Sequence, residues 1–133
     1  EVFDPYMRSS SNSLSASTSQ LLEWHLDFPA SFSNYKYHML ISASGTGPTT
    51  IVDLEVPLTL DTMMWKTIFG QFPTDARWIG PLNANGDAMI TQGVPAGAAS
   101  AMVGNTLYFA VVLHKRSRPP VLSSTVLPLT ILP

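Results

Sequence analysis

Residues 22–29 read Leu-Glu-Trp-His-Leu-Asp-Phe-Pro. In this stretch every second side chain is apolar and those between are polar, until the proline ends the pattern. Successive side chains of a strand point to opposite sides, so a strict period of two indicates a β-strand with one buried face. The stretch therefore predicts a half-buried strand that ends at Pro29.

The same alternation continues along the chain. Residues 35–43 repeat it and are followed by turn-forming residues 44–48. Residues 50–58 predict a third strand with one apolar and one partly acidic face. Residues 106–114 read Thr-Leu-Tyr-Phe-Ala-Val-Val-Leu-His and are apolar on both faces, which predicts a central strand. The charge-free residues 121–133 are expected to end the sheet.

One segment has helical spacing instead. Leu60, Met64 and Ile68 stand four residues apart, behind Asp61. Residues four apart share one face of a helix, and aspartate is a favourable N-cap. We expect one short helix here.

A tight turn is expected at residues 83–86, which read Asn-Ala-Asn-Gly. The Asn-Gly pair supplies the positive φ angles that two-residue hairpin turns need. Residues 77–82 and 88–94 are therefore predicted to form the two strands of a β-hairpin.

These elements together favour an all-β fold. About seven strands with turns at short intervals are typical of an antiparallel β-sandwich, here with one short helix. The two clearest strands predict which side chains are largely buried between the sheets. They are Trp24, Leu26, Tyr108, Ala110 and Val112.

The composition of the chain argues against several classes of function. The chain has 133 residues, no cysteine, 12% charged residues and a net charge of −2, where an average soluble domain has about 25% charged residues. Without cysteine there is no thiolate chemistry, and the scattered basic residues form no stripe for a phosphate backbone. The apolar runs are far shorter than the roughly 18 residues of a membrane span. We therefore expect neither a nucleic-acid partner nor a membrane span.

The N-terminal part differs in composition, which divides the chain into a Ser-rich arm at 1–19 and a sandwich domain at 20–133. Serine occupies seven of the eleven positions 9–19. Such a tract has little apolar surface with which to offset the entropy of its own ordering. We expect the arm to contact another copy of the chain rather than its own domain. Its apolar anchors would be Val2, Phe3, Tyr6 and Met7.

A free sheet edge would receive such an arm. The last segment carries no charge, and Pro128 alone protects it against a partner strand. Strand addition or arm exchange between copies would then build a homo-oligomer or polymer. The first hypothesis is a structural subunit of an extracellular filament or surface layer.

The order of the motifs resembles a β-sandwich domain often found at the C-terminus of uncharacterised exported bacterial surface proteins. The likeness covers about residues 20–133. The segments that carry it are 37–46, 56–58, 80–88, 107–113 and 126–131. The resemblance implies export to the cell surface or the extracellular space and implies no known activity.

No residue pattern indicates a catalytic or metal site. The three histidines, His25, His38 and His114, stand at no ligand spacing. No serine lies in a G-x-S-x-G motif. The carboxylates that could act as a pair, Asp53 with Glu55 and Glu23 with Asp27, alternate with apolar residues as on a solvated strand face. We expect no enzyme, no metal and no cofactor.

The alternative hypothesis is a carbohydrate-binding module of a secreted surface protein. Aromatic side chains on one exposed face stack against sugars, and Trp65, Trp78 and Tyr35 are the candidates for contact with a polysaccharide. Trp24 and Tyr37 are further aromatic candidates, although the alternation around Trp24 favours core packing.

Overall fold

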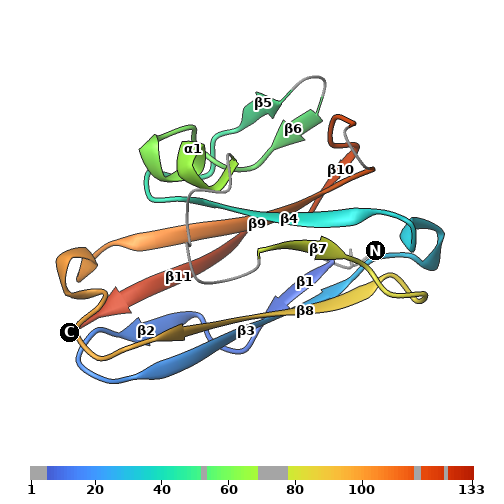
Figure 1. Cartoon of the computed structure of the whole chain (residues 1–133). Helices are drawn as coiled ribbons and strands as arrows, with labels where there is room; N and C mark the ends of the chain where they lie inside the picture. The colour runs from blue at the N-terminus through green and yellow to red at the C-terminus, as the bar shows by residue number, and fades with distance from the viewer. Residues whose placement is uncertain (1–5, 52–53, 69–77, 116–117, 125) are drawn as a thin grey trace, which may run out of the picture.

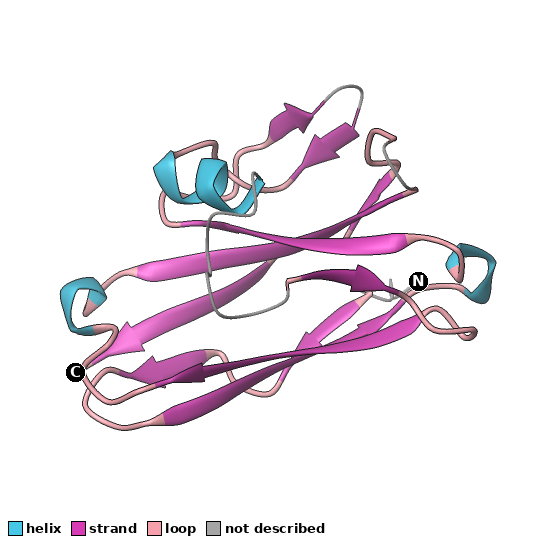
Figure 2. Ribbon diagram, viewed as in Figure 1, coloured by secondary structure: helices cyan, strands magenta, loops and turns pink. Residues whose placement is uncertain are grey.

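The computed structural model describes residues 6–51, 54–68, 78–115, 118–124 and 126–133. It is an all-β sandwich-like fold in which a curled sheet faces a smaller one (Figures 1 and 2). The smaller sheet has the order β1-β3-β8, with β1 Met7–Ser9, β3 Gln20–Asp27 and β8 Asp87–Val94. The curled sheet has the order β2-β11-β9-β4-β7. Its strands are β2 Ser13–Ser15, β11 Leu127–Leu132, β9 Thr106–His114, β4 Lys36–Ser42 and β7 Ile79–Pro81, and β10 Leu122–Ser123 pairs with β9.

A third layer lies outside the curled sheet. It contains the two-stranded ribbon of β5 Thr49–Ile51 and β6 Leu54–Val56, and the helix α1 Thr62–Ile68 (Figure 1). The 3-10 turns η1 Ala30–Phe32 and η2 Ser100–Met102 complete the described elements. Eleven strands occur in the described part of the chain rather than about seven, because six of them are only two or three residues long.

The central position of β9 is confirmed, and it explains why both faces of this strand are apolar. β9 lies between β11 and β4. Leu107, Phe109 and Val111 point into the core between the two sheets. Ala110 and Val112 belong to a second core, under α1 and the ribbon.

This second core corrects the predicted strand phase. Trp24, Leu26, Ala110 and Val112 are buried as expected, but the last two face away from the smaller sheet. Tyr108 is only partly buried. A strand with apolar side chains on both faces cannot show from its own sequence which face meets which layer.

Two predicted elements pair differently. Residues 50–58 form the two short strands of the β5–β6 ribbon rather than one strand, with residues 52–53 outside the described residues. The hairpin is wrong: β7 pairs with β4, whereas β8 pairs with β3. The turn is nevertheless present, since Asn83 Oδ1 accepts hydrogen bonds from the amides of Asn85 and Asp87 at 2.8 and 2.9 Å. It carries the chain from one sheet to the other.

The Ser-rich arm is part of the sandwich, so the division at residue 19 is not a domain boundary. β1 pairs antiparallel with β3 and β2 pairs parallel with β11. Met7 is 1% exposed and Leu14 is 3% exposed. The prediction that the arm avoids its own domain is wrong for residues 6–19, because alternate apolar side chains inside the Ser tract reach the core. β2 also covers the charge-free edge expected at the C-terminal strand.

Candidate functional site

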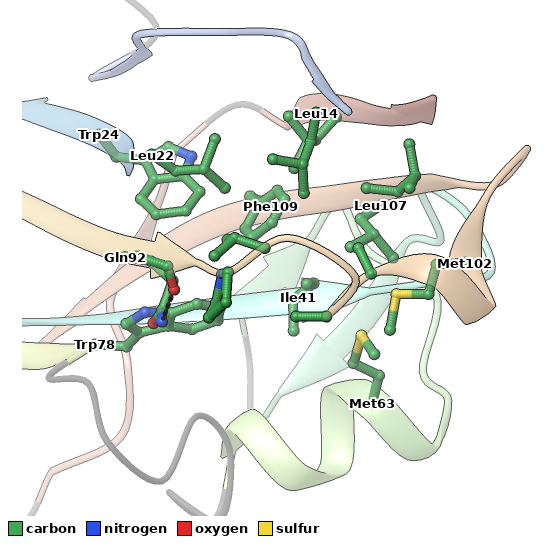
Figure 3. Close-up of a pocket in the computed structure, with 17 residues that line it drawn as sticks. Leu14, Leu22, Trp24, Ile41, Met63, Trp78, Gln92, Met102, Leu107 and Phe109 are labelled. Atoms are coloured by element: carbon green, nitrogen blue, oxygen red, sulfur yellow. Dashed lines mark hydrogen bonds between the residues drawn. The ribbon is translucent and has the colours of Figure 1, made fainter. Parts of the chain in front are cut away.

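An apolar cavity of about 390 Å³ lies between the two sheets (Figure 3). Both sheets contribute to it, and so do α1 and the segment around η2. Leu22 and Trp24 come from β3, and Ile41 and Phe109 lie opposite, on the curled sheet. An interior is ordinarily close-packed, so a hollow of this size is a candidate binding site.

Small side chains account for the space. After β8 the chain runs through residues 96–101, which read Ala-Gly-Ala-Ala-Ser-Ala. Ala98 and Ala99 line the cavity where larger side chains would fill it. Met63 and Met102 lie together at one end, and flexible thioether side chains there suit a binding surface of adaptable shape (Figure 3).

One polar group stands out at the other end. Gln92 on β8 lies beside Trp78, and its Nε2 donates a hydrogen bond to the carbonyl oxygen of Gly93 at 2.9 Å (Figure 3). Its Oε1 is buried and accepts no hydrogen bond from the part of the chain that the structure describes. A buried acceptor without a donor costs about 1–3 kcal/mol, so the Gln92 amide lowers the stability of the fold at this point.

A smaller hollow of about 210 Å³ lies on the outer face of β4 and β9. His38 and His114 border it with their ring centroids 6.4 Å apart, and Arg118 lies at its rim. Burial lowers the pKa of His38, a hydrogen bond to the Thr67 carbonyl oxygen at 2.6 Å acts in the opposite direction, and His114 lowers it further. His38 is therefore held in its neutral form.

The predicted glycan-stacking residues do not form one platform. Trp65 is 48% exposed on α1, whereas Trp78 is 6% exposed and packs against Trp24. Tyr35 is partly buried: its ring packs against Phe32, and Lys115 Nζ lies 5.2 Å from its centroid. Because Trp78 is buried between the sheets, it cannot form an exposed stacking platform with Trp65, which rules out its expected role. Trp24 and Tyr37 are core residues as well.

The predicted assembly anchors that the structure describes pack against their own chain. Met7 is buried in the main core, and the ring of Tyr6 stacks on Phe28 at 5.0 Å. Val2 and Phe3 lie outside the described residues. The anchors that can be placed therefore stabilise their own sandwich.

Comparisons with protein-family models, curated proteins and solved structures found no match for this chain. The resemblance to an exported β-sandwich domain thus stays a prediction. Among the described residues, no three His, Asp or Glu side chains gather where they could hold a metal ion. The described helices are also too short to cross a lipid bilayer.

Sequence reasoning missed the cavity and Gln92. The run of small residues at 96–101 is the signal in the sequence for unfilled space nearby. Gln92 follows the alternation of β8 as an inward-facing polar residue between Ile90 and Val94. A polar residue in the buried phase of a strand was the signal for a site.

Proposed function

We propose that this chain is a structural subunit of an extracellular or cell-surface assembly, in which two copies join by pairing β8 with β8. The observation that carries the proposal is the length of this edge. β8 has eight residues and, within the described ranges, pairs only with β3. The other described edge strands of the two facing sheets, β1, β2, β7 and β10, are only two or three residues long.

The β8 edge has little protection against another strand. Natural edges are guarded by lysine, proline or bulges. β8 contains no Lys, Arg or Pro, and its one charge is Asp87 at its first residue. On the solvent face beside this edge, Met89 is 53% exposed and Leu21 is 60% exposed. Both apolar side chains would lose solvent contact in a joint sheet.

The position of the one charge on β8 and the register of a strand pair both allow β8 to pair with β8 of a second copy. Antiparallel two-fold pairing centred near Ile90 or Thr91 would place the two Asp87 carboxylates at opposite ends of the joint ladder. Such a contact closes as a dimer with a continuous six-stranded sheet. A filament or surface layer needs a second interface, so the dimer is the minimal form of the proposal. A non-enzymatic role belongs to the same proposal.

The test is the mass in solution, by sedimentation velocity over a range of concentrations. The wild-type chain should show a dimer that dissociates on dilution. Met89→Lys with Thr91→Lys should weaken the dimer at least about tenfold, because two lysines on each edge repel the partner's lysines. Both side chains are exposed, so the fold should be retained.

His25→Lys is the matched control. It adds a lysine to the exposed face of the same sheet, but on the central strand β3, where no partner strand can add. It should leave the dimer intact. A wild-type chain that stays monomeric at high concentration, or a dimer that survives the double change, contradicts the proposal.

The carbohydrate-binding alternative has one observation in its favour, the exposed ring of Trp65. Retention of the chain on insoluble cellulose or chitin, removed by Trp65→Ala, would favour it. Assembly ranks first because an eight-residue edge offers more contacts than one ring.

A further inference from the structure

We propose that the hollow on the outer face of β4 and β9 binds a small carboxylate with an apolar body, and that Arg118 and His114 contact its charged end. The proposal rests on different observations from the β8 dimer. They are the sign of the charged groups at this hollow, its apolar floor and its volume.

The titratable side chains that border the hollow are all basic in the described part of the chain. They are His38, His114 and Arg118. Lys36 adds a positive charge beside them, because it is the register partner of His114 and its side chain lies on the same face of the sheet. The Arg118 guanidinium makes no ion pair with a described carboxylate. A free guanidinium beside an apolar surface attracts an anion, and its planar fork matches a carboxylate.

The described acidic side chains of the outer layer lie elsewhere. Asp61 caps the start of α1, whereas His38 contacts Thr67 near the end of this helix. Glu55 is exposed on β6, between two side chains that pack toward the second core. The basic groups at the hollow are therefore not neutralised by these carboxylates, although the chain as a whole has a net charge of −2.

The floor of the hollow is apolar and sets the body of the ligand. Its members come from the curled sheet, the β5–β6 ribbon, α1 and the segment before β10, and they are Leu40, Ile51, Ile68, Val112 and Pro120. A hydrocarbon group would lose contact with water on this floor, whereas inorganic phosphate would gain nothing from it. An apolar cavity of about 150 Å³ holds benzene, so a hollow of about 210 Å³ suits one such ring with a small substituent. Benzoate has this size and chemistry.

The hydrogen bonds of the two imidazoles set the orientation of the ligand. His38 Nε2 donates to the Thr67 carbonyl oxygen at 2.6 Å, so this N–H is not available. His114 Nδ1 donates to the Lys115 carbonyl oxygen at 3.0 Å, which leaves Nε2 for a ligand. A carboxylate near this ring favours its protonated form, whose Nε2–H donates a charge-assisted hydrogen bond. The carboxylate therefore lies on the side of Arg118 and His114, and the apolar body lies over the floor.

The test titrates benzoate and follows the ring C2 proton signals of the three histidines by NMR. We expect saturable shifts for His38 and His114, which border the hollow, and none for His25, which lies on the other sheet. Benzyl alcohol has the ring without the charge, and acetate has the carboxylate without the ring. Each should bind at least about tenfold more weakly than benzoate. Absence of a saturable shift with benzoate overturns the proposal.

Arg118→Gln should remove the preference for benzoate over benzyl alcohol. Lys66→Gln is the matched control, because it removes an exposed positive charge of the same outer layer that does not border the hollow, and it should leave the benzoate affinity unchanged. The lysine double variant of β8 should bind benzoate as the wild-type chain does, which separates this proposal from the dimer. Equal affinities for benzoate and benzyl alcohol, or an equal loss in the Arg118 and Lys66 variants, would show that no carboxylate site is present.

Discussion

Asp61 links three parts of the chain through one carboxylate. Its Oδ1 accepts a hydrogen bond from the Met64 amide at 2.8 Å, which caps α1. Its Oδ2 accepts from Ser44 Oγ at 2.7 Å and from the Ala43 amide at 2.9 Å. Partial burial alone would raise the pKa of Asp61, but these bonds and one from Ser42 Oγ lower it. The charged form therefore stabilises the attachment of α1 to β4.

Asp61→Ala should reduce the free energy of unfolding by about 1–2 kcal/mol, the usual cost of a lost N-cap. Asp61→Asn should cost less, because asparagine caps helices well. A lowered pKa in the folded state contributes stability above the ordinary value of 3.8, and this is lost as the pH falls through the folded pKa. Urea denaturation at neutral and acidic pH measures both effects. Equal acid sensitivity in wild type and Asp61→Ala would contradict this role.

His38 predicts a second pH dependence of the same sign as that of Asp61, because the folded state lowers the pKa of both groups. Its pKa lies below the ordinary 6.5 in the folded chain, so the unfolded chain binds the proton first. Stability should be fully present above pH 6.5 and fall as the pH drops below it. His114, which borders the same hollow, disfavours a further positive charge on His38.

His38→Gln should reduce this fall in the thermal midpoint measured between about pH 8 and pH 5. His25→Gln, at an exposed position on β3, is the control and should retain the wild-type profile. A His38→Gln chain with an unchanged profile would show that burial of this imidazole does not control the pH dependence.

At the scale of elements, the arm shows how a Ser-rich segment becomes ordered. β1 and β2 place Met7 and Leu14 in the main core, and the serines between them bond to the local backbone. Ser9 Oγ donates to the Ser11 carbonyl oxygen at 2.6 Å, and Ser11 Oγ does the same to Ser13. Local side-chain bonds of this kind satisfy polar groups that a short strand leaves unpaired.

Leu14→Ala should therefore cost about 2–5 kcal/mol of stability, as for other buried leucines. Asn12→Ala, exposed in the same arm, should cost little. Chemical denaturation of the two variants measures the difference. Removal of residues 1–16 should also destabilise the fold, rather than leave a stable sandwich that has lost only its ability to assemble. An equally stable truncated chain would restore the idea of a separate arm.

At the scale of the molecule, the two sides of the sandwich are closed differently. On one side β1 and β2 add to the edges at β3 and β11. On the other side β7 and β8 are the edges, and the long β8 edge has no partner beyond β3 in the described part of the chain. The proposed dimer uses this edge of β8.

Local patterns were sufficient for several elements. The alternation at residues 22–29 determined β3, the two apolar faces of residues 106–114 determined a central strand, and the spacing behind Asp61 determined α1. Each of these depends on neighbours within a few residues, where the periods of strands and helices and the chemistry of caps operate. The sequence by itself therefore determined the all-β class and much of the buried set.

Only the tertiary structure decided which strands meet. The parallel pairing of Ser13 with Thr130 places the arm on its own C-terminal strand, and the turn at Asn83 joins two sheets rather than two strands of one. The cavity likewise depends on side chains from six strands, α1 and η2. Pairing between distant segments and the volume left between layers depend on the packing of the whole chain, and no local period contains that information.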